Sequence, residues 1–470
     1  MSILQLFIIA AIAFLVGKMN KGRSLALLAI SAFLIYWLQP IQGNVTLTFW
    51  LPTATLVVTI LSWMLTSTPE MRGWKQNWPT LIVLLSVILL LDLNRYFALE
   101  GIFITATPRL QWIGLLFIAL LGLMVLVARV RKYPTFIYII AGASLILIFI
   151  LVKIPSAFSV FFGLLAAWRG KEGGGSLSLT WLGFSYVAFR LLHTILDRKA
   201  GRLPAVPLAD YVNYVIFFPA FTAGPIDRLE RFTHDLREPI ILDREGWLEV
   251  GTRFFLGLFK KFVIADALAW IALNDKFAQQ INSPAWMWFL LYSYSLRIYF
   301  DFSGYTDIAI GLGRLLGVRL PENFAFPYLK PNLTQFWNSW HMTLTQWFRS
   351  YFFNPLTRAL RSGKQSLSPF LIVLVVQVST MVLIGLWHGV TVGFVLWGLW
   401  HGTGLFIQNR WSGYIKDHIP VWGQTLNGQR VLNVAGVFLT FNFVSLGWLF
   451  FALPTPVKVW NVMAILFGVP

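Results

Sequence analysis

Long apolar stretches separated by short basic loops constrain this sequence more than any other feature. A helix needs about 20 mostly apolar residues to cross a bilayer, and in hydrocarbon only helices or closed barrels satisfy every backbone hydrogen bond. The composition agrees, since 57% of residues are hydrophobic and 12% are charged, against roughly 25% charged in soluble chains. We predict an all-α integral membrane protein, with its first long spans near 24–39, 48–66, 80–93, 110–128 and 134–153.

The loops between these spans alternate in charge. If the spans alternate in direction, three basic loops fall on one side, whereas the loop at 40–47 has no basic residue. The positive-inside rule makes the basic loops cytoplasmic and the N-terminus external. The net charge of +18 therefore reflects topology, and no nucleic-acid partner is expected. The basic loops carry Lys18, Lys21 and Arg23; Arg72 and Lys75; and Arg129, Arg131 and Lys132.

The segment Ile3–Gly17 could be taken for a signal peptide. It has no basic residues before it and no small-residue cleavage pattern after it, so we interpret it as a retained first helix. The sequence has no cysteine, which excludes disulfides, Cys-ligated zinc and a thiol nucleophile. A bound metal or cofactor is not expected.

After residue 155 the apolar pieces become shorter and are interrupted by charges. Such pieces are tolerated as re-entrant or half-membrane helices when they are buried in protein or line a cavity. The site is expected in this polar, aromatic middle, at about 180–405, which a loop, KEGGGS at 171–176, separates from the first spans. The short pieces are 155–168, 178–195, 208–222, 252–272 and 284–300, and clean spans return at 367–386, 391–408 and 431–452.

We therefore predict one polytopic domain over 1–470, with roughly 11 to 13 transmembrane helices and additional short helices. Its N-terminal spans occupy 1–170, the re-entrant region 178–352, and the C-terminal spans 367–470. The interpretation rests on hydropathy and charge alone.

The histidines divide by context. His234 and His418 lie in polar connections and are interpreted as surface residues, and His193 near a span end is interpreted as structural. His341 and His388 lie among aromatic residues in apolar segments, where ionisable side chains are functional by default. His341 is predicted on an amphipathic helix, and Gly389 after His388 would let a backbone or a substrate approach.

Charged residues form two further groups. In RIYFDFSGYTDIAIGLGR, Arg297 and Asp301 have the spacing of a helical ion pair, while Asp307 needs Arg314 or another helix as its partner. A charge-paired scaffold around a cavity is favoured there over direct catalysis. In FFPAFTAGPIDR at 217–228, a capped turn is favoured over substrate contact.

Several catalytic motifs are absent from the sequence: G-x-S-x-G, H-E-x-x-H, a P-loop, and a histidine with an aspartate five positions later. A pair of histidines without a nucleophile of the protein's own favours general-base catalysis. A neutral imidazole would take a proton from an acceptor hydroxyl, which attacks an activated carbonyl.

The chain resembles the membrane-bound O-acyltransferase family (MBOAT). It is most similar to the bacterial branch that includes the alginate O-acetylation protein and the D-alanyl transfer protein of teichoic acid modification. The resemblance covers about 180–452, with His341 and His388 47 positions apart (388 minus 341). It rests on FFPAFTAGPIDR, RIYFDFSGYTDIAIGLGRLLGVRLPENF, FWNSWHMTLTQWFRSYFFNPL and GLWHGVTVGFVLWGLWHG.

The resemblance implies an MBOAT-like helical fold with a central tunnel, in a bacterial inner membrane. His388 would be the catalytic base and His341 the second active-site residue. Arg349 would pair with an acid or hold an anionic donor group. The donor would be acetyl-CoA or an acyl-phosphopantetheine carrier protein, and the acceptor an exported polysaccharide or a partner acyltransferase protein. Residues expected to line or brace the tunnel are Trp387, Trp340, Arg349, Asp301, Tyr305 and Asp307.

The leading hypothesis is transfer of an acyl group, with acetyl expected, to a hydroxyl of an exported polysaccharide or its extracytoplasmic carrier. The first alternative is D-alanyl transfer from a carrier protein towards teichoic acid. A transporter or flippase is an alternative of another class, since broken helices and polar groups at the membrane midplane look similar in sequence. A lipid or protein acyltransferase within the same family also stays open.

Overall fold

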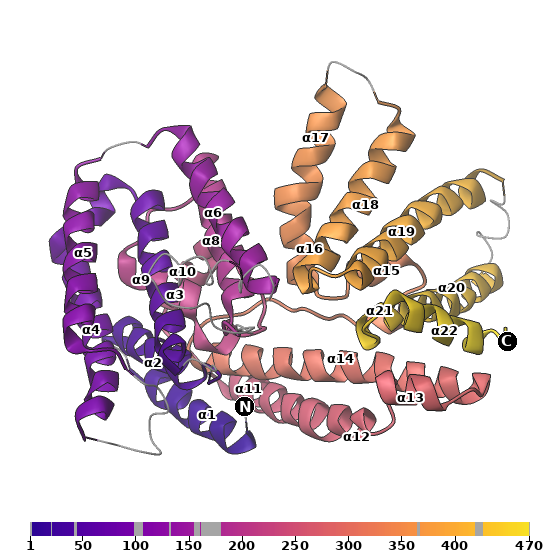
Figure 1. The fold of residues 1–470 in the computed structure, drawn as a ribbon, viewed down its shortest axis with the longest axis horizontal. Helices are drawn as coiled ribbons and strands as arrows, with labels where there is room; N and C mark the ends of the chain where they lie inside the picture. Colours follow the sequence, from indigo (N-terminus) through magenta and orange to yellow (C-terminus); the bar gives the residue numbers. More distant parts are fainter. Residues whose placement is uncertain are drawn as a thin grey trace. The chain divides into compact units, whose positions relative to one another are not determined.

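The computed structural model describes most of the chain as helix, and the described residues contain no strand. The chain divides into two compact units. Unit 1 comprises Met1–Phe254 and Ala309–Leu320, and unit 2 comprises Phe255–Ile308 and Pro321–Pro470; both are coloured along the sequence in Figure 1. The described residues are 2–19, 21–41, 45–97, 107–130, 133–154, 160, 180–363, 367–418 and 426–469.

Unit 1 begins with the helices that the apolar stretches predict, within a few residues at most boundaries. The Ser2 side chain caps the first helix by accepting from the backbone of Gln5, whose side chain accepts from the Ser2 backbone in return. The KEGGGS loop and the apolar piece at 155–168 lie outside the described residues, apart from residue 160. The helices are α1 (Ile3–Gly17), α2 (Arg23–Trp37), α3 (Val45–Thr66), α4 (Trp74–Phe97), α5 (Leu110–Ala128), α6 (Thr135–Lys153), α8 (Phe184–Lys199), α9 (Leu208–Ile216), α10 (Leu229–Arg237) and α11 (Arg244–Leu258).

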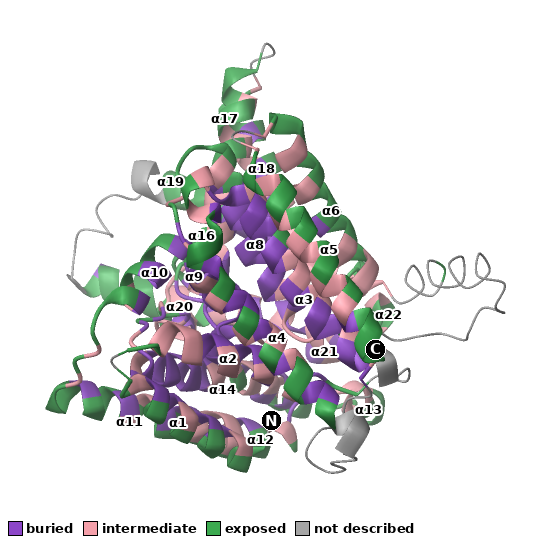
Figure 2. Cartoon of the chain, turned by 90° about the vertical axis from the view of Figure 1, so that its left-hand side faces the viewer, coloured by how far each residue is buried: buried purple, intermediate pink, exposed green. Residues whose placement is uncertain are grey.

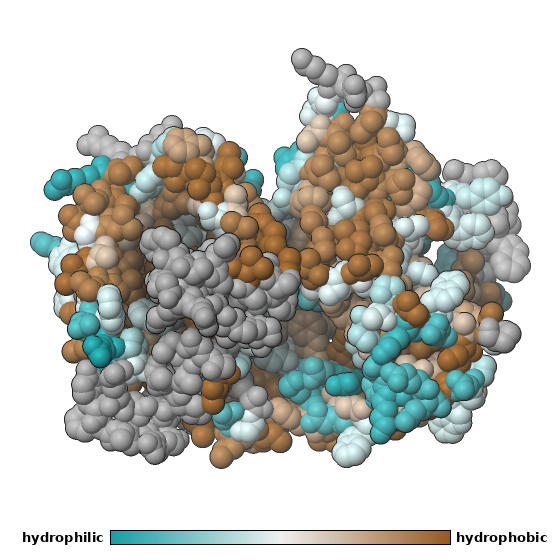
Figure 3. Space-filling view, in the orientation of Figure 1, coloured by the Kyte–Doolittle hydropathy of each residue, from teal (hydrophilic) through white to brown (hydrophobic). Residues whose placement is uncertain are grey.

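Helices α5 and α6 expose apolar side chains almost all round, as a lipid-facing helix does. Figure 3 shows this as brown surface over α5, and a second brown surface covers α18 in unit 2. By contrast, α8 and α9 are largely buried (Figure 2), although they contain Arg190, His193 and Asp210. Arg190 is buried because its guanidinium donates to the carbonyl oxygens of Val215 (2.7 Å) and Ala220 (2.8 Å).

The described residues of unit 2 form several long helices, several short ones and two π-helical turns. Most of α14 belongs to this unit, and its last residues belong to unit 1. The last residues of α11, from Phe255 onward, belong to unit 2. The helical segments are a π-helical turn (Phe259–Ala265), α12 (Asp266–Ala269), α13 (Asp275–Gln280), α14 (Pro284–Leu315), α15 (Leu333–Trp337), α16 (Met342–Phe348), a second π-helical turn (Arg349–Phe353), α17 (Asn354–Ser362), α18 (Pro369–His388), α19 (Val392–His418), α20 (Leu426–Gly447), α21 (Leu449–Ala452) and α22 (Pro456–Leu466).

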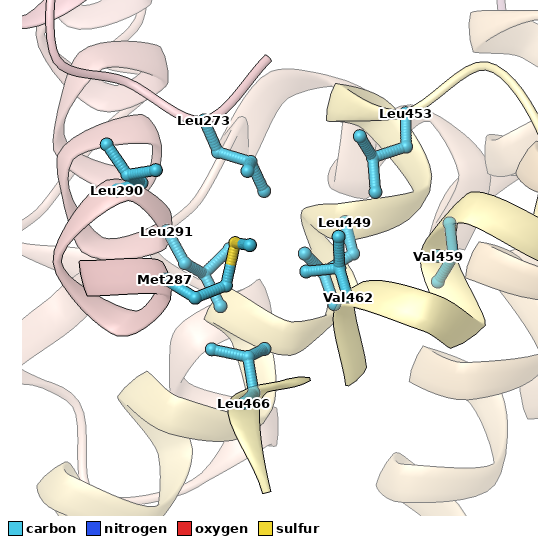
Figure 4. Packing of buried hydrophobic residues seen from close by; sticks show 9 residues of the cluster. All are labelled: Leu273, Met287, Leu290, Leu291, Leu449, Leu453, Val459, Val462 and Leu466. Carbon is cyan, nitrogen blue, oxygen red and sulfur yellow. The ribbon is translucent and has the colours of Figure 1, made fainter. Parts of the chain in front are cut away.

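An apolar core joins α14 to the end of the chain in unit 2. In Figure 4, Met287 and Leu291 of α14 point towards Leu449 of α21 and Val462 of α22. All four side chains are essentially inaccessible to solvent. This packing holds α21 and α22 against the helix that also carries the charged part of the candidate site.

Helix α14 corrects the expectation of a short, broken piece at 284–300. It runs without interruption for 32 residues, because its acids receive partners from the π-helical turn before it. Lys260 bonds Asp307 at 2.6 Å and Lys261 bonds Asp301 at 2.5 Å. The expected Arg297–Asp301 pair is therefore wrong, and Asp307 is paired from another helical segment.

Close backbone contact supports these ion pairs. A Cβ atom on Gly257 would lie 2.6 Å from the carbonyl oxygen of Gly304, and a Cβ on Gly304 would lie 2.8 Å from that of Gly257. The two segments can approach only because both positions are glycine, which is the common solution for close helix packing in membranes.

The chain is an all-α membrane protein. Within the described residues, six helices are long and apolar enough to cross a membrane by length and composition. Three shorter apolar helices accompany them: α1, α2 and α22. The expected total of roughly 11 to 13 transmembrane helices stays a prediction, as do the single domain over 1–470 and the central tunnel.

Candidate functional site

His388 is the last residue of α18, where the chain turns sharply into α19. Both helices approach closely at glycines: a Cβ on Gly398 would lie 2.5 Å from the Cα of Val382, and one on Gly402 would lie 2.7 Å from that of Val378. Figure 1 shows α18 and α19 side by side. Gly389 is also needed, because a Cβ there would lie 2.5 Å from the Phe394 ring. The group that approaches Gly389 is thus a neighbouring side chain.

Aromatic rings surround the imidazole of His388, which is half-buried. Ring centroids lie 4.5 Å away for Trp387, 4.9 Å for Phe451, 5.8 Å for Trp397 and 6.1 Å for Phe394. Such surroundings hold a ring in place, and they offer an apolar setting for an acyl group.

His341 lies just before α16 in the left-handed backbone region, with φ of 43° and ψ of 53°. The sequence placed it on the helix, which is wrong by one residue. Its side chain is buried, and neither ring nitrogen has a hydrogen-bond partner among the described residues. Burial without a counter-charge favours the neutral imidazole. The Phe302 ring of α14 lies against it, with 4.7 Å between centroids.

Trp387 connects the two histidines. Its ring lies 4.5 Å from that of His388 and 6.0 Å from that of His341, measured between centroids. Two residues far apart in sequence therefore meet at one indole within unit 2. Trp340, the neighbour of His341, is buried against other rings, including those of Tyr328 and Trp448, and so braces this cluster.

A pocket of about 310 Å³ lies in unit 2 between α15, α16, α18 and α19. Neither histidine lines it. Arg349 is its charged lining residue, and the lining contains no acidic side chain. Two lining residues carry buried polar atoms without a hydrogen-bond partner among the described residues, Nε1 of Trp337 and Oε1 of Gln377. The other lining residues are Thr334, Asn338, Thr345, Phe353, Thr380, Met381, Ile384 and Leu405.

Arg349 bonds an amide, whereas the expectation was an acid or an anionic donor group. Its Nη2 donates to Oδ1 of Asn338 at 2.6 Å, and no ion pair to Arg349 is present among the described residues. The guanidinium thus keeps donors for an anionic or polar ligand in the pocket.

The other predicted site residues lie on α14. Asp307 is buried with Lys260, and Asp301 is about half exposed with Lys261. These two acids and Tyr305 are not among the residues that line the pocket. In the described structure, α14 instead brings Phe302 to His341, and a role for Asp301, Tyr305 and Asp307 along a tunnel stays a prediction.

In unit 1, His193 is hydrogen-bonded like a structural residue and His234 is exposed like a surface residue, as the sequence predicts. His193 bonds the Tyr214 hydroxyl at 3.0 Å through Nδ1 and Asp197 at 2.9 Å through Nε2. The side chain of His234 is 72% exposed. His418 ends α19, and its side chain lies outside the described residues.

Asp227 lies near the end of the turn at 217–228. Its Oδ1 accepts from the backbone of Arg228 at 2.7 Å and pairs with Arg231 at 2.9 Å. Burial raises the pKa of this carboxyl, while the charge of Arg231 opposes the increase. These contacts join the end of the turn to α10, whose first turn has no side-chain cap; the capped turn that the sequence favours stays a prediction.

Two residues in unit 2 carry no individual signal in the sequence. His401 is fully buried between Trp337 and Trp397, and neither ring nitrogen has a partner among the described residues. Asn323 is fully buried as well and bonds the two residues that follow His341. A single asparagine in a loop, or one more histidine in an apolar segment, does not by itself indicate such contacts.

The sequence of this all-α membrane protein matches a known family. Residues 136–450 match the model of MBOAT, the membrane-bound O-acyltransferase family. The chain belongs to this family, and it is by class a membrane O-acyltransferase.

Relatives within the family differ in substrate. The chain is 31% identical to a teichoic acid D-alanyltransferase of Streptococcus thermophilus, covering 58% of this chain and 68% of the relative. It is 35% identical to a probable alginate O-acetylase of Pseudomonas syringae (57% and 48%) and to a peptidoglycan O-acetyltransferase of Helicobacter pylori (55% and 47%). The chain spans about half the length of these last two relatives.

Proposed function

We propose that this protein transfers an acetyl group from a cytoplasmic thioester donor to a hydroxyl of an exported polysaccharide or its extracytoplasmic carrier. The observation that carries the proposal is the contact of His341 and His388 with the same indole, Trp387. Thioester carbonyls are already activated, so the protein needs to supply a base and a shielded path rather than a nucleophile.

His388 is the proposed base, because it is the more accessible of the two rings. Its neutral imidazole removes the proton of the acceptor hydroxyl, whose oxygen attacks the thioester carbonyl carbon. The tetrahedral intermediate then expels the thiolate, and the imidazolium returns the proton to the sulfur. His341, buried and neutral, positions the reacting groups within the same aromatic enclosure.

The pocket beside the histidines is the proposed site of the donor's polar arm, from either acetyl-CoA or an acyl-phosphopantetheine carrier protein. Amide and phosphate groups of such an arm match Arg349, Gln377 and the Trp337 indole N–H. A D-alanyl thioester carries an ammonium group beside the reacting carbonyl, where the side chains that contact the two histidine rings among the described residues are aromatic and include no acid. This electrostatic difference supports acetyl over D-alanyl.

Location and orientation complete the proposal. The enzyme would lie in the bacterial inner membrane with its basic loops in the cytoplasm and its N-terminus outside. The donor would then enter from the cytoplasm, and the acceptor polymer or a partner acyltransferase protein would be reached from the other side.

The test is the polymer-bound ester content of cells that carry wild type, His388→Ala or His341→Ala at matched membrane levels. His388→Ala is expected to abolish the ester, and His341→Ala to reduce it strongly. Labelled acetate should enter the polymer and labelled D-alanine should not. Normal ester content with His388→Ala would overturn the role of His388 as the base, and D-alanine incorporation would overturn the acetyl assignment.

A further inference from the structure

Asn323 holds the backbone that follows His341. Its carbonyl oxygen accepts from the backbone N–H of Met342 at 3.0 Å. Its side-chain Oδ1 accepts from the Thr343 hydroxyl at 2.7 Å and from the Thr343 N–H at 3.3 Å. These bonds stabilise the left-handed conformation of His341, which is uncommon for a residue with a side chain.

The orientation of the Asn323 amide follows from these partners. A backbone N–H can only donate, so the atom that faces Thr343 must be the amide oxygen. The amide nitrogen Nδ2 therefore points elsewhere, and it has no hydrogen-bond partner among the described residues although it is buried. A buried donor that has no acceptor is unfavourable, so we expect this amide nitrogen to donate to a bound ligand.

The unpartnered amide belongs to the neighbourhood of the histidines. The Phe302 ring contacts both His341, at 4.7 Å between centroids, and Phe324, the residue after Asn323, at 5.1 Å. Both ring nitrogens of His341 likewise have no hydrogen-bond partner among the described residues. Asn323 and His341 are both buried and lie close together in the fold. Both thus have hydrogen-bonding groups without a partner among the described residues, in a site that otherwise consists of aromatic rings.

We propose that Asn323 is a further catalytic residue whose amide N–H donates to the oxygen of the thioester carbonyl. This rests on the proposed acyl transfer. When the acceptor oxygen bonds to the carbonyl carbon, the C=O π electrons move onto the carbonyl oxygen, and its negative charge is stabilised by the Nδ2 donor. When the C–S bond breaks, those electrons re-form the C=O bond and the thiolate departs.

The arrangement suits this role chemically. The Oδ1 bonds to Thr343 orient the amide before the reaction, so no reorganisation is needed when charge develops. Removing one such preorganised donor typically lowers kcat by about 10²–10³-fold. Because the effect arises in the transition state, it should leave donor binding almost unchanged.

Asn323→Asp provides the sharpest variant, since it keeps an acceptor oxygen for Thr343 and replaces the N–H donor with an acceptor. Membranes supplied with acetyl-CoA should form polymer ester at least about 100-fold more slowly. Affinity for the non-reactive thioether analogue of acetyl-CoA should stay within about twofold of wild type. A rate within threefold of wild type at matched protein level would overturn the proposal.

If the Asn323→Asp protein does not accumulate in the membrane, a pair of variants at Thr343 tests the role of the Asn323 amide instead. Thr343→Val removes the hydroxyl that anchors the amide, and Thr343→Ser is the matched control that keeps it. We expect the valine variant to be about tenfold slower than the serine variant with equal analogue binding. Equal rates would overturn the proposal.

His388→Ala separates this inference from the proposed function. If His388→Ala abolishes ester formation while Asn323→Asp does not, only the role of Asn323 fails. If wild-type membranes form no ester from either acetyl-CoA or an acetyl-phosphopantetheine carrier protein, the proposed function itself fails. If His388→Ala is active, the role of His388 as the base fails.

Discussion

Lys260 and Asp307 form an ion pair in which the Nζ and Oδ2 atoms lie 2.6 Å apart and the carboxylate is almost fully buried. It joins the π-helical turn at Phe259–Ala265 to α14. A buried pair is not in itself strongly stabilising, but loss of one partner leaves an uncompensated charge, at a cost of about 3–5 kcal/mol.

We therefore expect Lys260→Met to lower the unfolding temperature of the purified protein in detergent markedly. The double variant Lys260→Met/Asp307→Leu should recover most of the loss, because no charge is then left buried. Lys261→Met is the matched control: its partner Asp301 is about half exposed, so the change should be below about 1 kcal/mol. Equal losses at Lys260 and Lys261 would contradict this account.

Gly447 lies directly against His401. A Cβ atom at this position would come 2.5 Å from Nε2 of His401, which the buried imidazole can avoid only by displacing its aromatic neighbours. Gly447→Ala should destabilise the protein by about 1–3 kcal/mol. Gly413→Ala on α19 has open space around its Cβ and should be neutral or slightly stabilising. Thermal unfolding in detergent would compare the two.

Variants of His401 test whether its ring contributes through packing or through the polarity of its nitrogens. His401→Phe keeps an aromatic ring between Trp337 and Trp397. It removes two nitrogens that have no hydrogen-bond partner in the described part of the chain, so stability should be unchanged or higher. His401→Ala leaves a cavity and should cost about 3–5 kcal/mol, the range for removal of a large buried ring. A stable His401→Phe protein without transferase activity would instead show that the imidazole nitrogens have a partner during the reaction.

Arg349 should control donor affinity. Charged hydrogen bonds contribute about 1.5–3 kcal/mol, so Arg349→Ala should weaken binding of the thioether analogue of acetyl-CoA by about 10–100-fold. The control Arg361→Ala alters an exposed arginine on α17 and should have little effect. Unchanged affinity in Arg349→Ala at normal protein level would remove Arg349 from the donor site.

Helix positions could be predicted from the sequence where apolar runs were long. The stretches at 110–128 and 134–153 became α5 and α6 within one residue, because a lipid-facing helix must be apolar over its whole length. The piece at 284–300 was predicted too short, because α14 continues through Asp301 and Asp307, whose lysine partners are 40 or more positions earlier in the chain. Hydropathy is evaluated for one segment at a time, whereas the stability of a buried charge depends on a partner that can come from a distant segment.

The sequence by itself determined the membrane class, the first helices and the two histidines that stand out among aromatic residues. Each of these follows from local composition, since lipid acts on every residue of a span independently. Only the tertiary structure decided that the histidines meet at Trp387, that Arg349 bonds Asn338 and that Asn323 holds the segment after His341. Such contacts join residues from separate helices and loops, and their geometry comes from packing.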